Sequence, residues 1–295
     1  MRENLYVYRK IVLALIILIL SVTSYAQETN EYSATTTELT FNSNGKRMSG
    51  FVYQAAGKGP HPTVLLLHGY PGNEKNLDVA QALRRNGWNV AFFHYRGSWG
   101  SEGEFSFRNA EQDVQVVLQY LSNKENAEAL RVDQRLISTV GHSMGGHMAI
   151  AGILDNPAVK CSVAWDGANL GAEGVGLVND PNTTIPWKEY GDTLFMLNGW
   201  SGEKAQIETQ KYAKELDLVT RAEKINGRPV LLIGADTSVI PMELHIKPLL
   251  AALKTTKNSL VSYKLIKDDH SFNSSRKELI STTANFLDLN CKSTK

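Results

Sequence analysis

The sequence has little of what marks the specialised protein classes. Only 2 of its 295 residues are Cys and 9 are Pro, which excludes a disulfide-rich scaffold and a collagen-like chain. Neither sign of charge is in excess, because 31 Lys and Arg residues stand against 30 Asp and Glu residues. Without a basic patch or a charged tail, the chain is not expected to bind nucleic acid. The hydrophobic share of 42% predicts a large packed core, and we expect small-molecule partners.

The first 26 residues have the pattern of a signal peptide. Basic residues precede an apolar run at 11–20, and the small residues Ser24 and Ala26 precede Gln27, where cleavage is expected. The pattern predicts export to the periplasm or the medium, with 27–295 as the mature chain. A bilayer-spanning helix needs about 20 apolar residues, so no stable membrane insertion is expected after cleavage. An uncleaved signal anchor is the alternative.

Short apolar runs alternate with amphipathic stretches along the rest of the chain. The runs predict strands buried on both faces at 63–68, 89–95, 136–141, 161–165 and 229–234. The stretches between them predict helices at 77–85, 108–122 and 144–154. A hairpin is expected from 36–41 and 48–54, and a half-exposed strand at 260–266. The pattern indicates an α/β fold with a doubly wound, mostly parallel sheet.

One segment interrupts this alternation. Residues 166–227 lie between two predicted strands and carry several aromatic residues, followed by a helical stretch at about 204–224. We interpret the segment as an inserted helical cap, a lid that shapes a substrate pocket to which Trp187 and Trp200 contribute. A pair of ordinary surface helices is the alternative.

A candidate nucleophile follows the strand at 136–141. The G-x-S-x-G pattern of Gly141, Ser143 and Gly145 lies where a buried strand meets a helix, which is the context of a nucleophile elbow. Ser143 must adopt a strained backbone conformation there, and side chains at the two glycine positions would collide with neighbouring backbone.

A serine nucleophile needs a base, and the base needs an acid to orient it. His270 follows the strand at 260–266 and is the expected base. Asp236 follows the strand at 229–234, at the same edge of the sheet, and is the expected acid. Asp268 and Asp269 are sequence neighbours of the base and are expected to shape its turn instead. Asp166, at the end of an earlier strand, is the next carboxylate to consider.

An oxyanion site is expected from backbone N–H groups. The turn after the strand at 63–67 offers the N–H of Tyr70, since Pro71 has none, and the N–H of Met144 begins the helix after the nucleophile.

These segments together resemble the α/β-hydrolase superfamily. H-G-Y-P-G at 68–72, G-H-S-M-G at 141–145, G-A-D at 234–236 and D-D-H-S-F at 268–272 occur in the order that the superfamily uses for oxyanion loop, nucleophile, acid and base. The resemblance covers about 36–289 and implies an eight-stranded sheet. The segment at 93–103 is similar to a loop in secreted esterases of the feruloyl-esterase type and in prolyl oligopeptidase-like peptidases. Nothing upstream of residue 36 could form the propeller of the larger peptidases.

Metal and cofactor chemistry is not expected. His142 and His147 flank the elbow at a spacing unsuited to one helix face, and no cluster of Cys or carboxylates completes a metal site. Cys161 lies in a predicted buried strand and is expected to act as a small hydrophobic residue, although an exported chain permits a disulfide with Cys291.

The function expected from these residues is hydrolysis of a carboxylic ester through an acyl-serine intermediate. A peptidase or amidase using the same triad is the main alternative, and a non-catalytic scaffold, a lyase or a transferase of this fold are further ones. The substrate is expected to be a small-molecule ester or a short peptide, and the pattern specifies no oligomeric state.

Overall fold

The structure is a computed structural model that describes residues 32–292. Its sheet opens with a hairpin of β1 (Thr35–Ser43) and β2 (Lys46–Gln54), joined by Asn44 and Gly45. Both turn residues have positive φ, at 49° and 74°, which is the conformation that a two-residue hairpin turn requires. The predicted hairpin is confirmed.

The predicted parallel strands are also confirmed. They are β3 (His61–Leu67), β4 (Asn89–Phe93), β5 (Val132–His142), β6 (Val159–Trp165), β7 (Val230–Thr237) and β8 (Val261–Asp269). The eight strands have the order β1-β2-β4-β3-β5-β6-β7-β8. Antiparallel pairing joins β1 to β2 and β2 to β4, and all the other pairs are parallel.

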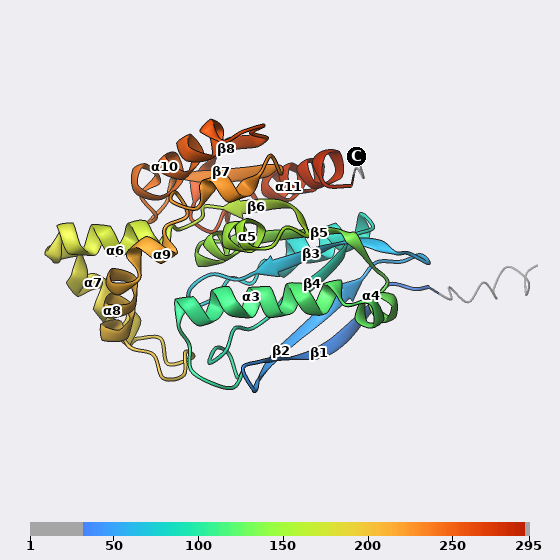
Figure 1. Ribbon diagram of the computed structural model, residues 1–295, viewed down its shortest axis with the longest axis horizontal. Coiled ribbons are helices and arrows are strands. Elements are labelled where there is room, and N and C mark those ends of the chain that lie inside the picture. Colours follow the sequence, from blue (N-terminus) through green and yellow to red (C-terminus); the bar gives the residue numbers. More distant parts are fainter. Residues whose placement is uncertain (1–31, 293–295) are drawn as a thin grey trace, which may run out of the picture. The chain divides into compact units, whose positions relative to one another are not determined.

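Helices cover both faces of the sheet, because side chains along a strand alternate between two apolar cores. On β3, Leu65 and Leu67 pack in one core, and Val64 and Leu66 pack in the other. The first core is completed by α3 (Phe107–Ser122), α4 (Lys124–Leu130), α5 (Met144–Asp155) and α10 (Met242–Thr255). The second is completed by α2 (Leu77–Arg85) and α11 (Arg276–Asn290). This is the doubly wound arrangement that the sequence predicts (Figure 1).

A helical insert separates β6 from β7. It contains α6 (Leu170–Asn179), α7 (Pro181–Asp192), α8 (Gly202–Lys211), α9 (Ala213–Leu216) and the 3₁₀ helix η1 (Ala222–Ile225). Figure 1 shows α6 to α9 gathered beyond one end of the sheet. The helical stretch expected at about 204–224 is broken, because Asp217 is extended and its carboxylate accepts a hydrogen bond from Val219 N.

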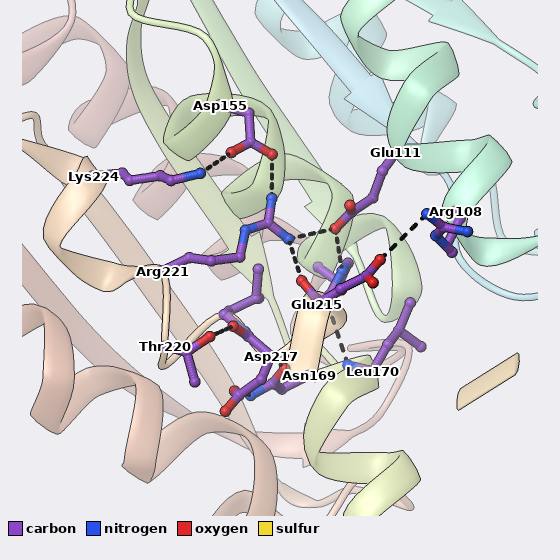
Figure 2. Close-up of polar contacts among 12 residues, drawn as sticks. Arg108, Glu111, Asp155, Asn169, Leu170, Glu215, Asp217, Thr220, Arg221 and Lys224 are labelled. Carbon is purple, nitrogen blue, oxygen red and sulfur yellow. Dashed lines mark hydrogen bonds and ion pairs between the residues drawn. The ribbon is translucent and has the colours of Figure 1, made fainter. Parts of the chain in front are cut away.

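Charged side chains join this insert to α3 and α5 (Figure 2). The Arg221 guanidinium donates to Glu111 Oε1 at 2.8 Å and also to Asp155. His147 Nδ1 accepts the Leu170 N–H at 3.3 Å, so the ring proton lies on Nε2, which donates to Glu111 Oε1 at 2.9 Å. Burial raises the pKa of the Glu111 carboxyl, but its contacts with His147 and Arg221 outweigh burial and lower it to about 2.

A disulfide connects β6 to the end of α11. Cys161 and Cys291 are both buried and bonded to each other, with their Cα atoms 5.8 Å apart. The expectation of an unpaired thiol at Cys161 is therefore wrong. The pairing depends on α11 packing against β6, a contact between segments separated by 130 residues that the local sequence does not reveal.

The Glu111 contacts predict a pH-dependent contribution to stability. The folded-state pKa lies below that of the unfolded chain, so the stabilisation is complete above about pH 4.5 and is lost as the pH falls toward 2. Glu111→Gln is expected to lower the free energy of unfolding at pH 7 by on the order of 2 kcal/mol. Urea unfolding across pH 7 to 3 should show the gap between variant and parent closing in the acid range. A gap that stays constant would contradict the assignment, and Glu189→Gln, at an exposed carboxylate of α7, is the control.

Candidate functional site

Ser143 lies at a sharp turn between β5 and α5. Its backbone has φ 59° and ψ −123°, which is a strained conformation for a residue with a side chain. The turn depends on close backbone contact, since a Cβ on Gly141 would lie 1.9 Å from the Gly145 carbonyl oxygen and one on Gly145 would lie 2.0 Å from the Leu67 carbonyl oxygen. The two glycines of the motif are therefore required because a side chain at either position would collide with backbone, as the sequence predicts.

His270 follows β8 directly and contacts a buried carboxylate. Its Nδ1 lies 2.5 Å from Asp166 Oδ2. Asp166 comes directly after β6 and has no exposed surface, and its backbone N–H donates to Ile233 O on β7 at 2.6 Å. Its Oδ1 accepts the Ala235 N–H at 3.1 Å, so β7 holds both the backbone and the side chain of this residue. The contact with a carboxylate favours a proton on His270 Nδ1 and leaves Nε2 as the basic nitrogen.

Asp236, the expected acid, is not the carboxylate that contacts His270. The prediction placed the end of β7 at Gly234, but the strand continues through Thr237 and stays paired with β8, with a register shift at Asp236 between Ala235 and Thr237. Asp236 is consequently exposed on that strand, where its Oδ1 accepts the Asp268 N–H at 3.0 Å. The position beside the imidazole is occupied by Asp166.

Asp268 and Asp269 have the turn-forming role expected of them. Asp268 Oδ2 accepts the N–H groups of Ser274 and Ser275, and Asp269 Oδ1 accepts that of Ser271. Both carboxylates fix the loop that carries His270 through local backbone hydrogen bonds.

Two residues near the imidazole were not identified from the sequence. Ser238 Oγ donates to Asp166 Oδ2 and lies 3.3 Å from His270 Nδ1. His142 Nε2 donates to the His270 carbonyl oxygen at 2.7 Å, and the two rings are 4.5 Å apart. Burial and the nearby His270 lower the pKa of His142 to about 4, so its imidazole is neutral at pH 7. The sequence does not reveal these contacts, because both residues are distant from His270 along the chain and meet it only in the folded structure.

The predicted oxyanion residues Tyr70 and Met144 line the same cavity as Ser143. Gly69, the residue before Tyr70, is so close that a Cβ there would be 3.1 Å from Ser143 Cβ. Met144 is the first residue of α5, where backbone N–H groups have no partner within the helix. The insert holds Tyr70, since Trp200 Nε1 donates to Tyr70 Oη at 2.7 Å and Tyr190 Oη donates to Tyr70 O at 3.3 Å.

A cavity of about 720 Å³ adjoins these residues. Ser143, His270, Tyr70 and Met144 line it together with residues of α6, α7 and the segment before α10. The insert therefore forms part of the cavity wall, as a lid would. Trp187 lines the cavity, whereas Trp200 contacts Tyr70 and is not among the residues of the wall.

The described part of the chain contains no group of three or more His, Cys, Asp or Glu side chains arranged to hold a metal ion. The chemistry that the site offers is that of a serine, an imidazole and a buried carboxylate at one end of an apolar cavity.

Comparison with known proteins agrees with this fold. A family model described as BD-FAE matches residues 51–164, which contain β3, β4, β5, the elbow, all of α5 and most of β6. A search of curated proteins found none that matches the sequence significantly.

Several solved structures have the same architecture. Est1E from Butyrivibrio proteoclasticus has a TM-score of 0.64 at 17% identity, covering 87% of this chain and 100% of that one. The Pyrococcus furiosus esterase Pf2001 has a TM-score of 0.62 at 17% identity, covering 86% and 92%. The acylaminoacyl peptidase of Pyrococcus horikoshii has a TM-score of 0.65 at 15% identity, covering 90% and 43%. The chain thus has the α/β-hydrolase fold, and its region from β2 to β6 matches the BD-FAE family.

Proposed function

We propose that this chain is a serine hydrolase that cleaves carboxylic esters through an acyl-serine intermediate. The observation that carries the proposal is the joint position of Ser143, on its strained turn, and His270, in contact with the buried Asp166, at one cavity. The match to BD-FAE, an abbreviation of bifunctional feruloyl/acetyl esterase, and the likeness to two esterases support ester chemistry.

Acylation begins when Ser143 Oγ attacks the ester carbonyl carbon and His270 Nε2 takes the hydroxyl proton. The negative Asp166 carboxylate stabilises the imidazolium that forms, since it is fixed 2.5 Å from Nδ1 by the backbone of β7. Negative charge on the former carbonyl oxygen is stabilised by the N–H groups of Tyr70 and Met144. Collapse of this intermediate expels the alcohol, which receives the proton from Nε2.

Deacylation repeats the sequence with water as nucleophile. His270 Nε2 takes a proton from water, the hydroxide attacks the acyl carbon, and Ser143 Oγ leaves with the proton that the imidazolium returns. An acid is released and the enzyme regains its starting state. His142 is a positioning residue in acylation and deacylation, because it donates a hydrogen bond to the backbone carbonyl of His270, the residue that transfers the proton.

Amide hydrolysis by the same residues is the second candidate. The fold likeness to the acylaminoacyl peptidase of Pyrococcus horikoshii favours it. The steps are the same except that His270 must protonate an amine as it leaves. Rates on matched p-nitrophenyl esters and p-nitroanilides distinguish the two candidates.

Export completes the proposal. The predicted signal peptide lies outside the residues that the structure describes, and the Cys161–Cys291 disulfide supports a final location in an oxidising compartment. Within 32–292, no helix is both long and apolar enough to cross a bilayer.

The export proposal predicts processing of the full-length chain in a Gram-negative host. Mass spectrometry of the protein recovered from the periplasmic fraction is expected to find an N-terminus at Gln27, and thiol labelling without reductant is expected to modify neither cysteine. Recovery of the unprocessed chain from the cytoplasm with reactive thiols would contradict it.

Ser143→Ala is the direct test of the enzymatic proposal. The substitution is expected to remove the nucleophile and lower ester turnover by at least about 10⁴-fold, while circular dichroism and the melting temperature stay as in the parent. Labelling by a fluorophosphonate probe should be lost as well. Near-parental turnover in the variant would mean that another group performs the attack.

The position of Asp166 gives a second kinetic prediction. Asp166→Asn is expected to lower kcat by up to about 10⁴-fold, because the amide cannot stabilise the imidazolium. Asp236→Asn is the matched control and should remain within about tenfold of the parent, since the Asp236 carboxylate is exposed and accepts the Asp268 backbone N–H. Steady-state kinetics on one ester, with unfolding curves for both variants, would show the opposite ranking if Asp236 were the acid.

A further inference from the structure

The wall of the cavity contains polar groups that the hydrolytic mechanism does not use. His245 on α10 is 1% exposed and lines the cavity. Its Nδ1 accepts the Asn169 N–H at 3.0 Å, so a ring proton lies on Nε2. Nε2 is buried and has no hydrogen-bond partner. Burying a donor without an acceptor costs free energy, and a hydrogen bond to a ligand oxygen would offset this cost.

Glu173, in the first turn of α6, lies beside this donor. Its Oε2 is 3.3 Å from His245 Nε2, but the two do not form a hydrogen bond. Within 32–292 the Glu173 carboxylate makes no side-chain hydrogen bond, although its side chain is only 24% exposed. The cavity therefore places an unused acceptor next to an unused donor.

Trp187, which also lines the cavity, carries a second unpartnered donor. Its indole Nε1 is also buried without a hydrogen-bond partner, and its ring packs near those of Tyr70 and Phe107, which line the cavity as well. Two N–H donors without partners and the carboxylate of Glu173 thus belong to residues of one largely apolar wall.

The kind of ligand is the one that can bind the Glu173 carboxylate and the His245 Nε2–H donor at the same time. An ammonium group would pair with Glu173 but leave the His245 donor unused, and a carboxylate would accept from His245 but be repelled by Glu173 and by Asp180, which lines the cavity too. No Lys or Arg side chain of the described residues lines the cavity to offset that repulsion. A hydroxyl donates to the carboxylate and accepts from the imidazole, so it satisfies both.

We propose that Glu173 and His245 form a subsite for a hydroxyl group of the substrate, away from its ester bond, with Trp187 Nε1 donating to a second substrate oxygen. This proposal rests on the proposed function, because it takes the ligand of the cavity to be an ester that Ser143 attacks. It makes Glu173 a specificity-determining residue, whose change alters the choice among substrates more than the rate of bond cleavage.

Binding to the inactive Ser143→Ala protein tests the subsite apart from catalysis. Isothermal titration calorimetry compares methyl ω-hydroxyalkanoates of increasing chain length with the isosteric esters that carry a methyl group in place of the hydroxyl. At the length that reaches the pair, the hydroxy ester is expected to bind about tenfold more tightly. Adding Glu173→Leu should reduce this ratio to about one, and Glu173→Gln, which keeps an acceptor oxygen, should retain part of it.

Glu189→Leu in the same Ser143→Ala background is the matched control, because Glu189 is an exposed glutamate of the insert outside the cavity wall. It should leave the ratio unchanged. Equal affinities for hydroxy and methyl esters at every length, or tighter binding of the matching ω-ammonio ester, would overturn the proposal. Failure of the proposed function would be seen separately, as absence of Ser143-dependent hydrolysis of the same esters by the unmodified chain.

Discussion

The site depends on one close approach of backbone to backbone. Strand β5 ends directly before Ser143, and α5 begins directly after it. A side chain at position 141 would collide with the Gly145 carbonyl oxygen, and one at position 145 would collide with that of Leu67. This packing keeps Ser143 at φ 59° and holds its side chain at the cavity. The same approach brings Gly69 against Ser143, and with it the turn that carries the Tyr70 N–H.

The buried carboxylate of Asp166 is positioned by a different constraint, the register between β6 and β7. Asp166 leaves β6 with its N–H bonded to Ile233 and its carboxylate bonded to Ala235, both on the neighbouring strand. Its side chain is therefore fixed at the sheet edge, where the loop after β8 brings His270. Ser238, just past the end of β7, contacts both the Asp166 carboxylate and the His270 imidazole.

The insert is attached to α5 and α10, two helices next to the cavity. Two buried imidazoles accept the first backbone N–H groups around the start of α6: His147 accepts from Leu170, and His245 accepts from Asn169. His147 lies on α5, the helix that begins after Ser143, and also donates to Glu111, which Arg221 of the insert binds. The insert, which forms part of the cavity wall, is thus hydrogen-bonded to the helix that begins after Ser143.

The sequence by itself determined the elements whose signals are local. Strand runs, the Asn44–Gly45 turn and the glycines around Ser143 need only nearby residues, and the structure has them where they were predicted. The partner of His270 and the pairing of Cys161 were decided only by tertiary structure. Both require knowing which strand ends lie side by side and how far β7 continues. Because β7 extends three residues beyond Gly234, Asp236 lies exposed on the strand, and Asp166 occupies the buried position beside His270. Contacts across 104 and 130 residues of chain arise from packing, which no local pattern encodes.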